Sequence, residues 1–226
     1  MSTPHLHGPR IEPRGGPAAL VVLLHGYGAN GDDLIALGEV WRRQLPQAVF
    51  VAPNAPEEVP GMPGALQWFP LTFRDPGERW RGVVAARPGL DRFLDAELAR
   101  YGLGDDRLVL VGFSQGTMLG LHAGLRRRVT PAAIVGYSGL LAGPEHLGEI
   151  TVRPPVLLVH GAEDDLIPVD ALHIAREQLA QAGVRVEWHV REGLGHGIDP
   201  VVQHLAGHFM AQTLGGKRRA ESGQSR

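Results

Sequence analysis

The chain has 226 residues, of which 43% are hydrophobic and 20% charged, with a formal net charge of -2 and a pI near 6.6. This composition excludes a disordered chain, which lacks the apolar residues needed to offset conformational entropy, and it provides no broad attraction to nucleic acid or anionic lipid. The absence of cysteine excludes a disulfide framework, a thiolate nucleophile and any cysteine-ligated metal.

The two ends of the chain differ in composition from the part between them. Residues 1–17 are rich in Pro, Gly and Arg, and residues 215–226 are rich in Gly, Arg and Ser. We expect a flexible N-terminal segment (1–17), a single domain (18–214) and a disordered tail (215–226). Because no stretch resembles a secretory signal or approaches the ~20 apolar residues of a membrane span, we expect a cytoplasmic protein without stable membrane insertion.

Between the ends, short apolar runs rich in β-branched residues alternate with segments of helical spacing. The expected strands are 19–24, 48–52, 108–113, 132–137, 156–159 and 184–190. The expected helices are 32–45, 83–101, 115–127, 169–182 and 200–214. This alternation predicts an α/β fold with a mostly parallel central sheet and helices on both faces. The proline-rich stretch 53–82 is the one long irregular segment, and such loops are often functional.

The loop after the first strand is rich in glycine, reading Gly26-Tyr27-Gly28-Ala29-Asn30-Gly31. Glycines permit a backbone whose N–H groups face inward, so the amide of Tyr27 is a candidate donor to a developing oxyanion. The alternative is an ordinary turn capped by Asn30 or Asp32. A dinucleotide site is not indicated, because no acidic strand end follows some 20 residues later.

The third strand runs directly into Gly112-Phe113-Ser114-Gln115-Gly116, which is followed by a helical segment. A Gly-x-Ser-x-Gly sequence between a strand and a helix is typical of a sharp turn that exposes a nucleophilic serine. The amide of Gln115 would then be the second oxyanion donor. An inert turn is the alternative, and Ser138 provides a comparison, since it also follows an apolar run but has leucine two positions later.

A serine nucleophile needs a base, and the base needs an acid to orient it. Of the eleven histidines, His196 is the one placed in a loop directly after the last strand, where parallel sheets carry chemistry. The acid is expected after the preceding strand, where Asp164 and Asp165 are adjacent and the residues alone do not choose between them. The order Ser, Asp, His is that of the α/β-hydrolase fold.

Four segments together resemble the phospholipase/carboxylesterase family of α/β-hydrolases, which includes acyl-protein thioesterases and small bacterial carboxylesterases. They are His25-Gly26-Tyr27-Gly28, Gly112-Phe113-Ser114-Gln115-Gly116, His160-Gly161-x-x-Asp164-x-x-Ile167-Pro168 and Gly195-His196. The resemblance extends over roughly residues 19–212. It implies that Asp164 is the acid, that His25 and His160 are scaffold residues beside the site, and that a homodimer is an assembly state to test.

The same resemblance implies a loop bordering the acyl pocket at Gln67-Trp68-Phe69-Pro70-Leu71. Trp68, Phe69, Leu71 and Phe73 would line an apolar channel, or else would belong to a satellite core, and Ile167 is assigned to the same substrate-binding group. The sequence departs from the eukaryotic thioesterases in this loop and in carrying Tyr27, where they commonly have leucine.

We therefore expect a serine carboxylesterase that acts on small-molecule esters of small or medium acyl chains, without a cofactor or metal. The alternatives are a thioesterase or lysophospholipase with the same triad, and a non-catalytic ligand-binding homologue. No His-Glu-x-x-His or other metal-ligand spacing favours a metal hydrolase.

Overall fold

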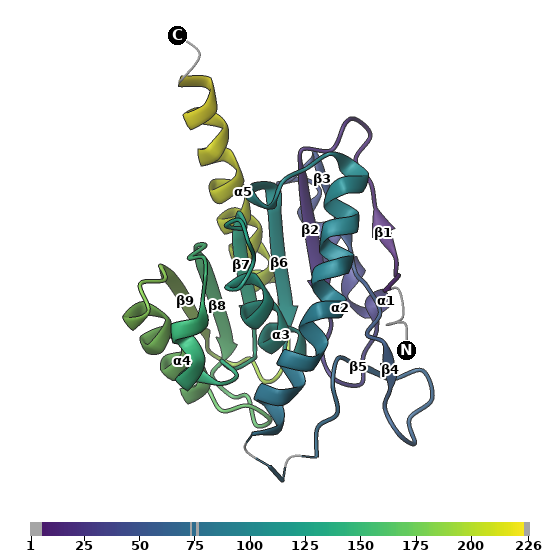
Figure 1. Cartoon of the computed structure of the whole chain (residues 1–226), viewed down its shortest axis with the longest axis vertical. Helices are drawn as coiled ribbons and strands as arrows, with labels where there is room; N and C mark the ends of the chain where they lie inside the picture. The colour runs from purple at the N-terminus through teal and green to yellow at the C-terminus, as the bar shows by residue number, and fades with distance from the viewer. Residues whose placement is uncertain (1–5, 73, 76, 224–226) are drawn as a thin grey trace.

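The computed structural model describes residues 6–72, 74–75 and 77–223, with side chains as far as residue 215. Its main feature is a seven-stranded sheet with the strand order β1-β3-β2-β6-β7-β8-β9 (Figure 1). The strands are β1 (Arg10–Ile11), β2 (Ala19–Leu24), β3 (Ala48–Val51), β6 (Leu108–Phe113), β7 (Ala133–Tyr137), β8 (Val156–Gly161) and β9 (Val186–Arg191). All neighbouring strands are parallel except β1, which pairs antiparallel with β3. The predicted mostly parallel α/β fold is confirmed.

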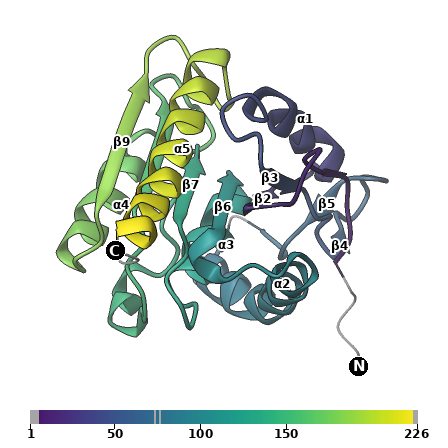
Figure 2. The ribbon, with the colours of Figure 1, turned by 90° about the horizontal axis from the view of Figure 1, so that it is seen from above.

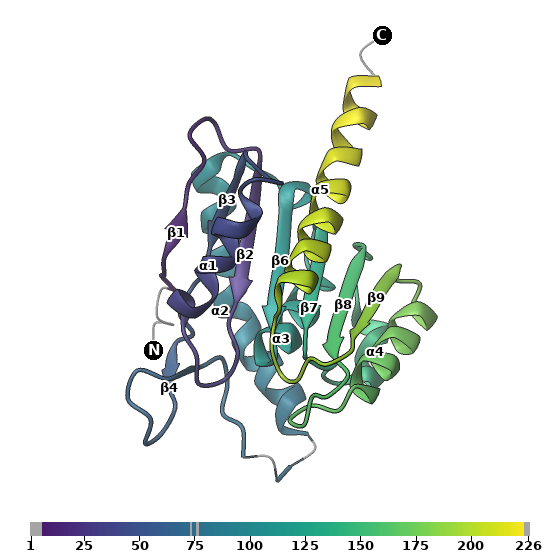
Figure 3. The same cartoon turned by 180° about the vertical axis from the view of Figure 1, so that it is seen from behind.

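In the described part of the chain, five α-helices cover the two faces of this sheet. They are α1 (Gly31–Trp41), α2 (Glu78–Tyr101), α3 (Gln115–Gly124), α4 (Asp170–Gln181) and α5 (Pro200–Gly223), and two short 3-10 helices, η1 (Asp105–Arg107) and η2 (Pro144–Glu149), lie in the connections. Helices α2, α3 and α4 lie on the face seen in Figure 1, and α1 and α5 lie on the opposite face, seen in Figure 3. Viewed from above, the sheet runs between these two helical layers (Figure 2).

Side-chain alternation along the strands divides the core into two clusters. In β2, Leu20, Val22 and Leu24 join the cluster on the α2–α3–α4 side, whereas Val21 and Leu23 join the cluster on the α1–α5 side. All six residues of β2 are buried. A central strand that is covered on both faces therefore reads as a continuous apolar run, which is why it was predicted with its observed bounds.

The ordered part of the chain begins earlier than residue 18, the expected domain boundary. Strand β1 extends the sheet at its edge, with Arg10 opposite Val51 and Ile11 opposite Phe50. Gly8 packs so closely that a Cβ there would lie 2.0 Å from the carbonyl oxygen of Ala52. Residues 7–11 of the segment predicted to be flexible (1–17) therefore pack against the sheet, which differs from that prediction. A strand of two residues is too short to show a hydrophobic period, so the sequence pattern did not predict β1. Residues 1–5 lie outside the described part.

Two further segments differ from the sequence-based bounds. Helix α5 continues to Gly223, past the expected domain end at 214, because the Lys-Arg-Arg-Ala-Glu sequence that follows consists of good helix formers. This corrects the predicted disordered tail as far as Gly223, and residues 224–226 lie outside the described part. Within the stretch predicted to be irregular, β4 (Glu57–Glu58) and β5 (Leu66–Gln67) form a small antiparallel ribbon, and α2 begins at Glu78.

The loops that carry the candidate catalytic residues all leave the carboxyl ends of parallel strands. Because the strands are parallel, the segments after β2, β6, β8 and β9 emerge at one edge of the sheet, the lower edge in Figure 1. Among the described residues, no helix is both long enough and apolar enough to cross a membrane.

Candidate active site

Ser114 lies at the sharp turn between β6 and α3. Its backbone has φ 52° and ψ -114°, a strained conformation for a residue with a side chain, and it is the residue that immediately precedes α3. The amide of Ser114 donates to the carbonyl of Tyr137 on the neighbouring strand, at 2.9 Å. The strain is thus held by the sheet, and the serine stands at the strand end with its side chain only partly buried.

The two glycines flanking Ser114 are required by close backbone contacts. A Cβ at Gly112 would lie 2.4 Å from the amide of Thr117, and a Cβ at Gly116 would lie 2.0 Å from the carbonyl oxygen of Leu24. Any side chain at either position would push α3 away from the sheet. The Gly-x-Ser-x-Gly pattern therefore has a direct steric origin in this fold.

Ser138 shares one feature of Ser114 but lacks another. It also has a positive φ, 44°, at the end of β7. However, Ser138 is only 1% exposed, and its amide donates to the carbonyl of Val159. A hydroxyl closed off in this way has no access to a substrate, so the geometry agrees with the sequence-based preference for Ser114.

Asp164 and His196 form a hydrogen bond across the edge of the sheet. The His196 Nδ1 lies 2.8 Å from Asp164 Oδ2, and the Asp164 side chain is fully buried. Since an ionised carboxylate can only accept, Nδ1 carries the proton and Nε2 is left as the basic nitrogen. Asp165 is exposed, and of the two adjacent carboxylates it is Asp164 that the structure joins to His196.

Several donors surround the Asp164 carboxylate. Burial raises its pKa, but hydrogen bonds from the Ile167 amide, from His196 and from the Leu166 amide together outweigh burial, so the net pKa lies below its usual range. His160 also approaches, with Nε2 at 3.2 Å from Asp164 Oδ2 and 2.7 Å from the carbonyl of Ile167. These contacts hold the acid charged and in one orientation.

The position of His196 depends on a glycine at the end of β8. A Cβ at Gly161 would lie 2.2 Å from the carbonyl oxygen of Leu194 and 2.3 Å from that of Gly195. Absence of a side chain therefore lets the loop after β9 pack directly against β8. The imidazole also contacts the ring of Phe113, with the ring centroids 5.0 Å apart, which brings His196 beside the residue preceding Ser114.

Within the described residues, no hydrogen bond joins the Ser114 hydroxyl to His196. Such contacts are commonly long in free enzymes and tighten when substrate binds. The arrangement therefore contains an oriented base and a partly buried serine at one strand edge, with the final contact left to the substrate complex.

The two proposed oxyanion donors belong to α3 and to the loop after β2. Gln115 is the first residue of α3, whose initial N–H groups have no partner inside the helix. Tyr27 lies in the loop after β2, and this loop lies against the turn, since a Cβ at Gly26 would be 3.4 Å from Ser114 Cβ. The neighbouring Gly28 amide donates to the Leu66 carbonyl at 2.8 Å, which ties the loop to β5. Asn30 caps α1, as the alternative interpretation of this loop expected, and the role of the Tyr27 amide stays a prediction.

The side chain of Gln115 has a second contact that sequence reasoning missed. Its Oε1 accepts from the Trp68 amide at 2.9 Å, and its Nε2 donates to the Phe69 carbonyl at 2.7 Å. A glutamine is suited to this because its amide offers an acceptor and a donor side by side, matching an extended backbone. The residue after the nucleophile thereby fixes the segment Gln67-Trp68-Phe69-Pro70-Leu71, which we call the Trp68 loop.

His25 supports the same loop. Its ring accepts from the Ala55 amide at Nε2, at 3.0 Å, so Nδ1 carries the proton and donates to the Gly26 carbonyl at 2.8 Å. Burial lowers the pKa of this histidine. The His25 carbonyl accepts from the Trp68 indole at 2.9 Å. His25 is therefore a neutral scaffold residue.

The predicted substrate-binding residues are placed in different ways. Trp68 and Phe69 are 3% and 2% exposed, so both are core residues, and they also line a pocket. Leu71 is partly buried against the same core. Ile167 packs there too and donates its amide to Asp164. Phe73 lies outside the described residues. The structure thus places Ile167 next to Asp164, and it places Trp68 and Phe69 next to the side chain of Gln115.

Comparison with known proteins gives a consistent result. The sequence profile of the family described as Phospholipase/Carboxylesterase matches residues 8–214. The chain is 31% identical over 175 residues to acyl-protein thioesterase 1 of Schizosaccharomyces pombe, covering 74% of this chain and 77% of the relative. It is 30% identical over 184 residues to esterase YpfH of Escherichia coli, covering 80% and 76%. The crystal structure of esterase PE8 superposes with a TM-score of 0.89 at 42% identity, covering 92% of this chain and 99% of that one.

Proposed function

Because the chain belongs to the phospholipase/carboxylesterase family, whose members are serine hydrolases acting on ester bonds, we propose that it is a carboxylesterase for esters of small or medium acyl chains. The observation that carries this proposal is the hydrogen bond between His196 and the buried Asp164, at the strand edge where Ser114 stands in its strained turn. These three residues supply the base, acid and nucleophile of acyl transfer.

In the proposed mechanism, Nε2 of His196 removes the hydroxyl proton of Ser114 as the oxygen attacks the ester carbonyl. Asp164 accepts from Nδ1–H and stabilises the imidazolium that forms. The amides of Tyr27 and Gln115 donate to the oxyanion of the tetrahedral intermediate.

Collapse of the intermediate expels the alcohol, which takes its proton from His196 and leaves an acyl-enzyme on Ser114. Water then attacks the acyl carbonyl while His196 removes its proton, and the carboxylic acid leaves as the serine is regenerated.

Small or medium acyl chains are favoured by the way the Trp68 loop is held. Trp68 and Phe69, the aromatic residues expected to border an acyl channel, are buried and fixed at their backbones by Gln115. The pocket that Trp68 and Phe69 line is not lined by Ser114, so a long acyl chain attached to this serine would have to displace this packed segment to pass it. The substrate preference would then follow from how little room the loop leaves.

Replacement of the nucleophile tests the mechanism. We expect Ser114→Ala to reduce kcat for p-nitrophenyl acetate hydrolysis on the order of 10⁶-fold, as in other triads, with an unchanged thermal unfolding midpoint. Ser138→Ala is the matched control and should retain activity when folded. Undiminished turnover by Ser114→Ala protein would contradict the assignment.

Thioester hydrolysis is the second candidate, because several similar proteins are named acyl-protein thioesterase 1. The same triad would cleave either bond, so only the substrate preference separates them. We expect kcat/KM to fall with chain length across p-nitrophenyl esters from acetate to palmitate, and to be lower for acyl-CoA and lysophospholipid. A maximum at palmitate, or faster acyl-CoA cleavage, would favour the second candidate. Failure of a fluorophosphonate probe to label Ser114 in folded protein would indicate a non-catalytic homologue.

A further inference from the structure

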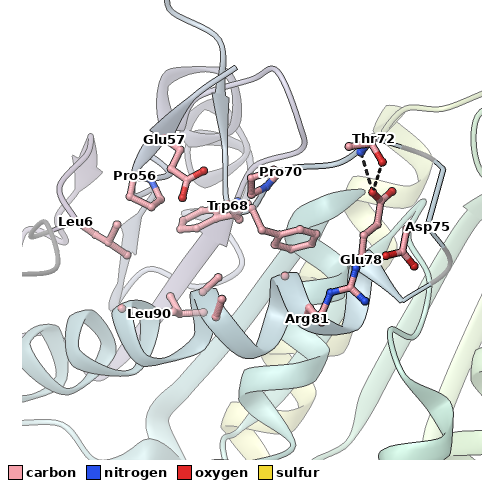
Figure 4. Close-up of a pocket in the computed structure, with 15 residues that line it drawn as sticks. Leu6, Pro56, Glu57, Trp68, Pro70, Thr72, Asp75, Glu78, Arg81 and Leu90 are labelled. Atoms are coloured by element: carbon pink, nitrogen blue, oxygen red, sulfur yellow. Dashed lines mark hydrogen bonds and ion pairs between the residues drawn. The ribbon is translucent and has the colours of Figure 1, made fainter. Parts of the chain in front are cut away.

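A pocket of about 600 Å³ lies between the Trp68 loop and helix α2, apart from the catalytic residues (Figure 4). Its volume is in the range of sites for small organic ligands. Its lining includes none of the candidate catalytic and oxyanion residues, which are Ser114, Asp164, His196, Tyr27 and Gln115. The site described above therefore does not account for this pocket.

The floor of the pocket is apolar. Trp68 and Phe69 of the loop line it together with Ala86 and Leu90 of α2. Trp68 and Leu90 lie on opposite sides of the pocket, with Pro56 at the side (Figure 4). The walls approach closely because Gly82 of α2 has no side chain, and a Cβ there would lie 2.2 Å from the Phe69 ring. An alkyl or aryl group would be removed from water on this surface.

The rim of the pocket is acidic. Three carboxylates line it, those of Glu57, Asp75 and Glu78, against a single cation, Arg81, which already pairs with Asp75. Glu78 accepts from the amide and hydroxyl of Thr72, at 2.8 and 2.7 Å. The Glu57 carboxylate makes no hydrogen bond or ion pair with any other described residue. The rim therefore favours a positive charge beside Glu57.

The wall of the pocket is also joined to the catalytic turn. The Trp68 amide and the Phe69 carbonyl bond to the Gln115 side chain, whose own amide is the proposed oxyanion donor. The Trp68 indole also donates to the carbonyl of His25, in the loop that carries Tyr27. An occupant resting on Trp68 and Phe69 would act on the catalytic residues through these connections and would leave the ester site itself free.

We propose that this pocket is a second, non-catalytic site that binds a small organic cation, with its alkyl or aryl group against Trp68 and Phe69 and its ammonium group beside Glu57. The binding does not depend on ester hydrolysis, so it is tested in Ser114→Ala protein, where failure of the proposed function has no effect on the result.

The probe is benzyltrimethylammonium, and its neutral isostere, neopentylbenzene, is the control. Both compounds are titrated into the protein, and binding is followed by tryptophan fluorescence and by calorimetry. We expect the cation to bind with 1:1 stoichiometry and more tightly than the neutral compound. Glu57→Gln should weaken cation binding by about 2–5-fold, the value of one exposed charge pair, without affecting the neutral compound. Equal affinities for the cation in both proteins would overturn the role of Glu57.

The location is tested by filling the pocket. Ala85→Phe places a ring at an exposed α2 position that lines the pocket, and Val84→Phe places the same ring on the adjacent exposed position outside it. We expect at least about tenfold weaker binding for Ala85→Phe and parental binding for Val84→Phe. Unaltered binding to Ala85→Phe protein, or no binding to the parent, would overturn the proposal. Competitive inhibition of ester hydrolysis by the cation would also overturn it, because the site would then be part of the catalytic cleft.

Discussion

Two adjacent aspartates in the loop after β8 have different surroundings, so their replacement should have different effects. Asp164 accepts from His196 and from two backbone amides, whereas Asp165 is exposed. We expect Asp164→Asn to lower kcat for p-nitrophenyl acetate on the order of 10⁴-fold, because an amide stabilises the wrong tautomer of the imidazole.

The neighbouring residue provides the control. Asp165→Asn changes the charge one position away and should leave kcat within about twofold, since a single exposed charge has little influence on a buried base. Stopped-flow or steady-state assays at pH 8 distinguish the two variants. Comparable losses in both would mean that the acid is not specific to position 164.

At the scale of elements, the contact of α3 with β2 determines where the nucleophile stands. Gly116 and Gly120 lie on the same face of α3, but a Cβ at Gly116 would lie 2.0 Å from the Leu24 carbonyl oxygen, and one at Gly120 would lie 3.4 Å from the Leu24 methyl group. We expect Gly116→Ala to reduce the free energy of unfolding by about 3 kcal/mol, because backbone cannot move aside as a side chain can.

Gly120→Ala is the matched variant on the same helix. It should leave the free energy of unfolding within about 1 kcal/mol of the parent, because ordinary van der Waals contact is accompanied by a gain in helix propensity. Urea denaturation of both variants gives the comparison. Equal destabilisation would show that the smooth helix face as a whole, rather than the contact at Gly116, sets the packing.

For the whole molecule, buried histidines link stability to pH. His122 packs with its ring edge against Trp80, and its pKa is lowered to about 3 by burial first and then by Arg126, Arg87 and His146. Burial lowers the pKa of His25 as well. The folded protein therefore keeps both rings neutral at pH values where the unfolded chain, with a histidine pKa near 6.5, takes up protons.

The sign follows from this proton uptake. Since the unfolded state binds more protons, the stabilising contribution is complete above pH ~6.5 and is lost as the pH falls, by up to ~1.4 kcal/mol per pH unit for each histidine. Urea denaturation between pH 7 and pH 5 measures the slope, in a range above the titration of Asp164. His122→Leu should have a smaller slope than the parent. An identical slope would show that His122 does not carry the linkage.

The sequence by itself determined the fold class and the six parallel strands of the main sheet, and it indicated the main candidate residues. Central strands such as β2 and β6 are covered on both faces, so they read as continuous apolar runs, and Ser114 directly follows β6. His196 lies in the loop after β9, an edge strand whose residues are mostly half-buried. Local patterns of this kind depend on residues close together in the chain. The edge strand β1 and the continuation of α5 were missed because neither has an apolar pattern of its own.

Only the tertiary structure decided which groups meet. The choice of Asp164 over Asp165 depends on which carboxylate is turned toward a loop 32 residues away. The role of the Gln115 side chain depends on a loop 46 and 47 residues distant, and the pocket lined by Trp68 depends on how α2 passes beneath that loop. Contacts between distant segments follow from the packing of strands and helices into layers. A sequence pattern contains only the residues that make such packing possible, and Gly116, which lets α3 approach β2 next to the nucleophile, is an example.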